Sequence, residues 1–399
     1  MEKEIVLGEP EDTLENAVDS DAVTTDPDEF FKKNAFRMVY QTNNFFLPQI
    51  RDLIDKGEIL NLRPEYQRRL RWNSVQKSRL IESLLLNIPV PPIFLYESKA
   101  ARYEVMDGQQ RLNAVREFVA GDFNLTGLKV LKPLNGLSYS RCPPRIKRTL
   151  DRSSISAIVL LLESGTDDVA SHRTLDDIRG TIFDRLNTGG TKLNPQELRN
   201  AVYPGEFNKS LINLTRYSLF TEVFDIPPYV EADPNDYYEN PTRQKNILYA
   251  SMGDCQLVLR YFALKEDENI RGSMKLMLDR AMANRTGLNK DACEKFEEEF
   301  KARFSYLYNL FGGAPFTLPT NEKKSSRVSA ALYDALMVAI DQKWGHRDDI
   351  EHDKSGVASR LNSALAEDSK FKVLTGYGNT AQAVRDRIVL ANDILLPIN

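Results

Sequence analysis

The chain has 399 residues, of which 28% are charged and 42% hydrophobic, with a formal net charge of −4; this length and composition predict two or three folded domains. Its three cysteines, Cys142, Cys255 and Cys293, are widely spaced and odd in number, which argues against a disulfide framework or a zinc site. The N-terminus has no apolar signal core and no apolar run is long enough to cross a bilayer, so we expect a cytoplasmic protein without a membrane partner.

The N-terminus is strongly acidic. Residues 1–30 contain eleven acidic residues and one lysine, a local charge of −10 that leaves +6 for the rest of the chain. Such a segment cannot bury enough apolar surface to fold alone. We expect an acidic disordered tail over residues 1–33 that solvates the protein, with a role as a DNA mimic as the alternative.

A basic stretch rich in aromatic residues follows, because arginines surround Tyr66 and Trp72. These arginines are Arg63, Arg68, Arg69 and Arg71. The next residues predict an amphipathic helix that begins at Asn73 or Ser74, buries Leu80 and Leu84, and ends before a proline-rich run. A short strand is expected from Ile93 to Tyr96.

The most informative segment is a predicted strand, turn and helix. Residues 103–106 alternate like a strand, Asp107-Gly108 forms a sharp turn, and residues 110–120 have helical spacing that Gly121 ends. A helix N-terminus binds anions through its backbone N–H groups, and Arg111 can fork onto a phosphate. Asp107 can cap the helix or hold a cation. A structural turn without a ligand is the alternative.

Several short motifs in this order closely resemble the N-terminal domain of GmrSD-type modification-dependent restriction systems, which has a ParB/sulfiredoxin-like fold. They are Pro64–Arg68, Trp72, Leu80–Ser83, Ile88–Pro91, Asp107–Arg111 and, about 70 residues further on, Phe183–Asn200. The resemblance covers roughly residues 36–203. It implies a domain that binds a nucleoside triphosphate and, in restriction members, hydrolyses it to control DNA cleavage.

The resemblance also implies roles for individual residues. Asp107 and Arg111 would be catalytic, with Asp107 assisting a magnesium ion or the attacking water. The phosphates would be cradled from the turn and from the facing loop by Gly108, Gln109, Gln110, Arg111, Gln67 and Arg68. Which nucleoside triphosphate is bound stays open.

The second block predicts a loop between two helices. Gly189 and Gly190 permit positive φ and close backbone approach, so together with Asn187 they are further candidates for phosphate binding. Arg185 and Arg199 are candidates for binding across the cleft. A plain helix connector is the alternative, with Asn194 and Pro195 as the cap and first residue of the next helix.

Restriction systems of this type usually carry a His-Asn-His nuclease domain. The chain has three histidines, His172, His346 and His352, and the last two lie in a charged stretch that we expect to be a solvated loop rather than a metal site. A separate nuclease or effector protein is therefore the implied partner, together with DNA. A homo-oligomer is also compatible with the sequence.

The expected fold class is α+β: a small ParB/sulfiredoxin-like mixed α/β domain at residues 34–170 precedes a larger all-helical domain at 171–399. Strands are expected near Ile93, Tyr103, Phe123 and Ser156. Helices are expected at 194–203, 206–219, 244–264, 270–284, 289–312, 325–343, 355–366 and 379–393. Two apolar stripes, residues 257–264 and 296–311, predict core rather than a site.

Three functions are compatible with these patterns. The first is a nucleoside triphosphatase subunit of an antiphage restriction system. The second is a non-enzymatic DNA-binding or regulatory module, whose contacts would come from Arg63, Arg68, Arg69, Arg71, Lys77 and Arg79. The third is a nuclease that uses Glu104 and Asp107, but strand alternation predicts that these two carboxylates face opposite sides.

Overall fold

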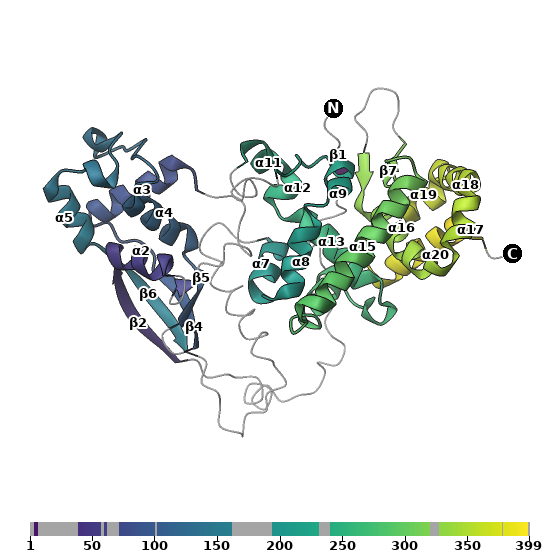
Figure 1. The fold of residues 1–399 in the computed structure, drawn as a ribbon, viewed down its shortest axis with the longest axis horizontal. Helices are drawn as coiled ribbons and strands as arrows, with labels where there is room; N and C mark the ends of the chain where they lie inside the picture. Colours follow the sequence, from purple (N-terminus) through teal and green to yellow (C-terminus); the bar gives the residue numbers. More distant parts are fainter. Residues whose placement is uncertain are drawn as a thin grey trace, which may run out of the picture. The chain divides into compact units, whose positions relative to one another are not determined.

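The computed structural model has two compact units, each with its own hydrophobic core (Figure 1). One unit comprises residues 19–193, and the other comprises residues 1–18 together with 194–399. The structure describes residues 4–6, 39–56, 60–61, 72–99, 102–161, 194–230, 240–319, 327–376 and 378–397. A mixed sheet in the first unit and helices in the second confirm the α+β class. The predicted boundary near residue 170 lies outside the described residues.

The first unit is built on a five-stranded sheet with the order β2-β6-β4-β5-β3. Its strands are β2 Val39–Phe46, β3 Leu60–Asn61, β4 Ile93–Lys99, β5 Arg102–Asp107 and β6 Ser154–Leu161. Strands β4 and β6 are parallel, as are β3 and β5, while the β2–β6 and β4–β5 pairs are antiparallel. This mixed pairing requires long connections between the parallel strands, and helices supply them.

Helices cover one face of this sheet (Figure 1). They are α2 Leu47–Asp55, α3 Ser74–Leu85, α4 Gln109–Ala120 and α5 Pro144–Arg152, with short 3₁₀ turns at Lys132–Leu134 and Tyr139–Arg141. Strand β6 shows the expected alternation, since Ile155, Ala157 and Val159 are buried while Ser154 and Ser156 are exposed. The helical layer therefore encloses one core, on one side of the sheet.

The predicted strand near Phe123 is wrong. Residues 122–131 form a loop whose backbone N–H groups bond to side chains of α3: Thr126 donates to Ser78 Oγ at 2.9 Å and Leu131 donates to Glu82 Oε1 at 2.7 Å. The ring of Phe123 packs on Phe118 with centroids 5.4 Å apart. The strands predicted near Ile93, Tyr103 and Ser156 are confirmed, and β2 was not anticipated.

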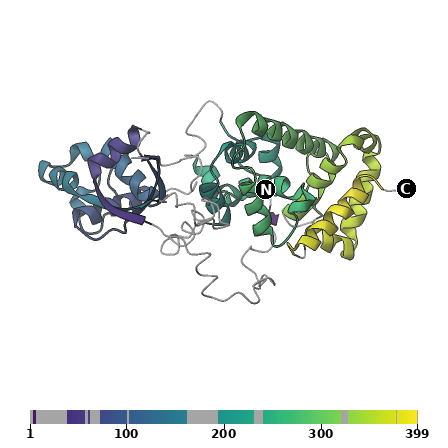
Figure 2. The same cartoon turned by 90° about the horizontal axis from the view of Figure 1, so that it is seen from below.

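The second unit is helical around a central helix, α16 Ala330–Gln342. Its eleven residues from 330 to 340 are all buried, including Asp334, which pairs with Arg260 of α13. The surrounding helices are α7 Pro195–Val202, α8 Glu206–Leu214, α9 Ser218–Val223, α11 Pro241–Lys245, α12 Ile247–Ala250, α13 Gly253–Leu264, α14 Met274–Ala283, α15 Lys290–Leu310, α17 Arg347–His352, α18 Lys354–Ala366, α19 Asp368–Thr375 and α20 Ala381–Leu395. Both views place the yellow C-terminal helices together at one end of this unit (Figure 1, Figure 2).

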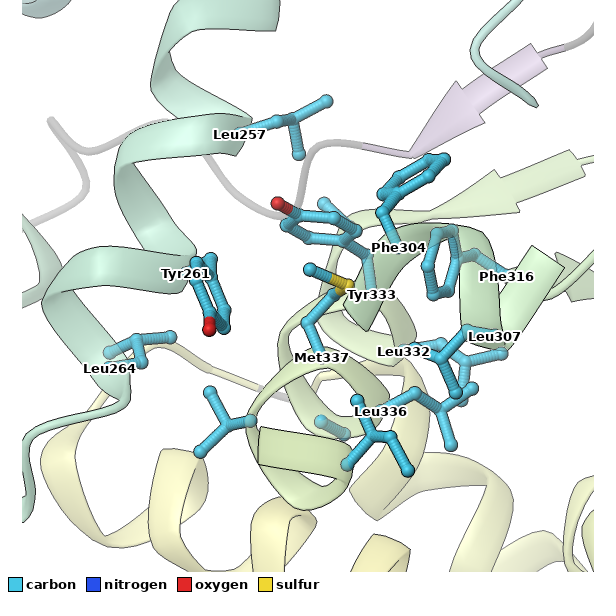
Figure 3. Packing of buried hydrophobic residues seen from close by; sticks show 14 of the residues in the cluster. Leu257, Tyr261, Leu264, Phe304, Leu307, Phe316, Leu332, Tyr333, Leu336 and Met337 are labelled. Carbon is cyan, nitrogen blue, oxygen red and sulfur yellow. The ribbon is translucent and has the colours of Figure 1, made fainter. Parts of the chain in front are cut away.

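The two predicted apolar stripes do form core. Leu257, Tyr261 and Leu264 of α13 are buried against α16, and Phe304 and Leu307 of α15 approach it as well (Figure 3). Phe300 of the second stripe is also fully buried, while Phe296 and Phe311 are partly buried and pack against the core. These residues are therefore structural, as predicted.

A small sheet and a break in one predicted helix distinguish the second unit from the all-helical domain that the sequence predicted. A three-stranded sheet with the order β1-β8-β7 joins Glu4–Val6, Arg327–Ser329 and Thr317–Leu318, so the N-terminal end of the predicted acidic tail contains a strand. The predicted helix over 244–264 is broken, because Asn246 caps a separate helix, α12, and Met252 adopts a left-handed φ of 55°. The rest of the acidic tail lies outside the described residues.

Candidate functional site

The turn between β5 and α4 can be made only with glycine. Gly108 is buried, has a φ of +96° and is the N-cap residue of α4. A Cβ atom at this position would lie 2.3 Å from Cγ2 of Ile93, the first residue of β4. Both the left-handed backbone and the close approach to β4 therefore exclude larger residues.

Arg111 folds back across this turn. Its Nη2 donates to Asp107 Oδ2 at 2.7 Å and to the carbonyl oxygen of Pro92 at 3.4 Å. Its side chain is 13% exposed and that of Asp107 is 35% exposed. Asp107 does not cap α4, which has no side-chain cap. The capping role considered for Asp107 is therefore replaced by an ion pair that orients Arg111.

The proline-rich run before β4 supplies one of these contacts, the Pro92 carbonyl. Helix α3 ends at Leu85, and Asn87 adopts a φ of 53° while Ile88 N–H bonds back to the Ser83 carbonyl at 2.9 Å. This left-handed ending is a frequent helix C-terminus. The prolines then carry the chain in an extended path that brings the Pro92 carbonyl beneath Arg111.

The described residues that flank the basic segment 62–71 contact β5 and α4. Strand β3 runs parallel to β5, with Asn61 opposite Glu104, so it leads toward the same sheet edge as Asp107. At the other end, the backbone N–H of Trp72 donates to Gln110 Oε1 at 3.1 Å. Gln110 thus holds Trp72, the residue that follows the segment carrying several predicted site residues.

Most of those residues lie outside the described part of the chain. On segment 62–71 they are Arg63, Gln67, Arg68, Arg69 and Arg71. In the second block they are Asn187, Gly189 and Gly190. Their roles stay predictions, whereas the structure does place Asp107, Gly108, Gln109, Gln110 and Arg111 together in one turn.

Residues 50–204 match the family model described as GmrSD restriction endonuclease, N-terminal domain. This segment is a GmrSD-type N-terminal domain. The matched segment includes the glycine turn, the basic segment and the second block, and the match indicates a restriction-system component. Searches of curated proteins and of solved structures found no match to the chain. No helix among the described residues is both long and apolar enough to span a membrane.

The GmrSD-type domain match extends beyond the sheet unit into α7. Asn194 caps this helix by accepting from the N–H groups of Gln196 and Glu197, and Pro195 is its first residue, both as predicted. Arg199 is 2% exposed and donates to Asp279 at 2.7 Å, so it forms an internal contact of the helical unit rather than a surface for ligand. The end of the second block is therefore a buried structural element.

Lys77, a predicted DNA contact on α3, has an internal partner. Its Nζ pairs with the carboxylate of Glu117 on α4, and it lies 5.7 Å from the centroid of the Phe123 ring. Its side chain is only 17% exposed. A phosphate would have to compete with Glu117 for this charge, and DNA binding by Lys77 stays a prediction.

Glu82 is a residue whose role the sequence patterns did not indicate. It is buried on α3 and accepts hydrogen bonds from the backbone N–H groups of residues 129–131, the shortest being 2.7 Å from Leu131. Burial raises its pKa, but these hydrogen bonds outweigh burial and hold the pKa below its ordinary value. In the sequence, the position of Glu82 next to the apolar Ile81 was the signal that could have indicated its burial.

A bulge in β5 changes the expected direction of two carboxylates. Leu95 pairs with Val105 but Phe94 pairs with Asp107, so Met106 is an extra residue in β5. Phe94 and Tyr96 are two residues apart in β4 and so lie on the same side of the sheet. Their partners, Asp107 and Glu104, therefore occupy positions on that same side. The expectation that they face opposite sides is wrong. The described residues nevertheless hold no cluster of three or more His, Cys, Asp or Glu side chains that could bind a metal.

The two C-terminal histidines lie at either end of α17. His346 Nδ1 is 3.4 Å from Asp349 Oδ2, and its side chain is 60% exposed. His352 Nδ1 lies 2.6 Å from the carbonyl oxygen of Asp348. The stretch is exposed as predicted but forms a short helix instead of a loop.

Proposed function

We propose that this protein is a nucleoside triphosphate-binding and hydrolysing subunit of a restriction system, which regulates DNA cleavage by a separate nuclease. The nucleotide site is the turn Asp107–Arg111. The observation that carries the proposal is the position of the Arg111 guanidinium. It is held at the N-terminus of α4 through Nη2, while its Nε and Nη1 make no hydrogen bond to any residue that the structure describes.

This arrangement suits phosphate for physical reasons. The N-terminus of α4 carries the positive end of the helix dipole and has no side-chain cap. Arg111 is already oriented by Asp107 and Pro92, so little side-chain entropy is lost when its remaining donors bind a phosphate.

A magnesium ion is compatible with these residues. Mg²⁺ usually keeps several waters and is bound by one or two carboxylates together with substrate phosphates. Asp107 is 35% exposed and uses Oδ2 for Arg111, while its Oδ1 has no hydrogen bond to the described residues. When bound, the ion would neutralise charge on the phosphates; Asp107 would then hold it or orient the attacking water.

The test is phosphate release from each of the four ribonucleoside triphosphates with magnesium, with and without DNA. Arg111→Ala and Asp107→Ala should abolish turnover while the far-ultraviolet circular dichroism is retained. Arg116→Ala is the matched control, because Arg116 is on the same helix but its Nε donates to Asp55 at 3.1 Å. Its turnover should equal that of the wild type.

A second candidate function is a non-enzymatic DNA-binding module of the same kind of system, which the exposed arginines of α5 favour. It becomes the better account if the wild-type protein neither binds nor hydrolyses any of the four nucleotides. The triphosphatase proposal also fails if Arg111→Ala and Arg116→Ala lose activity equally. An equal loss would mean that activity depends on the positive charge of α4 in general and not on the arginine of the turn.

A further inference from the structure

Helix α5 presents a row of three arginines to solvent. Arg145, Arg148 and Arg152 are spaced three and four residues apart, which places them on one face of the helix, and all three are exposed. The opposite face is apolar: Leu150 is fully buried and Ile146 packs against the same core. We call these three residues the arginine row.

The arginine row has no compensating charge among the described residues. None of its members forms an ion pair there, and Asp151 accepts a hydrogen bond from the Tyr139 hydroxyl instead. Like charges three and four residues apart destabilise a helix, and Arg145 lies in the first turn, where the helix dipole disfavours a cation. Arg152 lies in the last turn, where the dipole favours a cation, so helix stability accounts for Arg152 but not for Arg145 and Arg148.

The row is the centre of a larger basic region. Residues 129–152 contain seven lysines and arginines and one acidic residue, a charge of +6 that equals the whole surplus of residues 31–399. Lys129 and Lys132 are exposed and form no ion pair with the described residues, and Lys147 lies 5.0 Å from the centroid of the Tyr139 ring. Figure 1 shows α5 at one end of the helix layer, where it packs beside α2 and α3.

We propose that the arginine row binds the phosphate backbone of duplex DNA. Seven residues of helix span about 10 Å, and a DNA strand carries one phosphate per about 3.4 Å of axis, so the row can follow neighbouring phosphates. Contacts of this kind position a duplex without reading its sequence. The proposal rests on the part of the proposed function that concerns DNA cleavage. It does not depend on the nucleotide turn, because it involves different residues.

The test measures binding of the full-length protein to a labelled duplex of about 30 base pairs by fluorescence anisotropy, without nucleotide, over a range of salt concentrations. The variant is Arg145→Gln/Arg148→Gln/Arg152→Gln. The control is Lys290→Gln/Lys301→Gln/Lys370→Gln, which removes the same net charge from helical-unit lysines that are paired with acids on their own helices or next to them.

We expect the arginine variant to bind DNA more weakly and its slope of log K against log salt to be shallower by about 2.7, from about 0.9 for each lost phosphate contact. The control should keep the wild-type slope. Equal slopes for the two variants would overturn the proposal. If the triple variant does not fold, Arg148→Gln alone should reduce the slope by about 0.9, and an unchanged slope would overturn it.

Two further measurements separate DNA binding by the arginine row from nucleotide hydrolysis and from attachment to a membrane. Phosphate release without DNA should be the same in the arginine variant and in the wild type. If the wild type releases no phosphate, the nucleotide site is contradicted, but the result of the DNA-binding experiment is not affected. Binding to vesicles containing phosphatidylserine should be weak and equal in wild type and variant. A variant that loses vesicle binding but keeps DNA binding would overturn the proposal in favour of a membrane surface.

Discussion

The guanidinium of Arg111 donates a 2.7 Å hydrogen bond to the carboxylate of Asp107, four residues earlier in the chain and across the turn at Gly108. Both side chains belong to the motif that most strongly indicated a phosphate site. The pair shows that Asp107 orients the arginine instead of capping the helix. The motif thus supplies a positioned guanidinium at a helix N-terminus, which is the feature that phosphate binding requires.

Gly108→Ala should destabilise the protein and remove nucleotide binding. A non-glycine residue in left-handed geometry costs about 1–2 kcal/mol, and overlap with Ile93 adds about 1–3 kcal/mol. Gly121→Ala separates these effects, because Gly121 has a similar φ of +90° but nothing lies within 4 Å of the place that an added methyl group would take. Urea unfolding should show the larger loss for Gly108→Ala. Equal losses would mean that contact with Ile93 is unimportant.

Gln110→Ala should loosen the chain at Trp72. The variant removes the acceptor of the Trp72 N–H, a contact of about 1 kcal/mol. In a Trp344→Phe background, Trp72 is the remaining tryptophan, so its emission should shift to longer wavelength and its anisotropy should fall. Gln382→Ala, at an exposed position of α20, is the control. Unchanged emission combined with lost nucleotide binding would instead make Gln110 a direct ligand.

Glu82 should make stability depend on pH in acid. Its pKa in the folded protein lies below the ordinary value of 4.5, because hydrogen bonds from residues 129–131 outweigh the effect of burial. The stabilisation is therefore fully present above the unfolded pKa and is lost as the pH falls through the folded pKa. Urea midpoints measured from about pH 7 to about pH 3 should fall less steeply below about pH 4.5 for Glu82→Gln than for wild type. Glu294→Gln, at an exposed site, should retain the wild-type slope.

Local sequence chemistry was sufficient for the elements around the site. Asn73 caps α3, Gly121 ends α4, and Asn194 with Pro195 opens α7, all as the sequence indicated. Each of these features depends on residues within one helical turn of one another. Strand alternation and helical spacing also placed the turn at Asp107 correctly between a strand and a helix.

Contacts between distant residues were not predictable in this way. Trp72 and Gln110 are 38 residues apart, and Lys77 and Glu117 are 40 apart. Their pairing depends on how α3 and α4 pack side by side over the sheet. The bulge at Met106 is a further example, because strand alternation alone assigns Glu104 and Asp107 to opposite sides.

The sequence by itself determined the glycine turn, the helix caps and the apolar stripes, because backbone geometry and the period of a helix act over a few residues. Only the tertiary structure decided which charges remain available. In the folded protein Lys77 forms an ion pair with Glu117, and Arg199 forms one with Asp279. The arginines of α5 have no acidic partner among the described residues. Charge pairing depends on side chains that the fold brings together from distant parts of the chain.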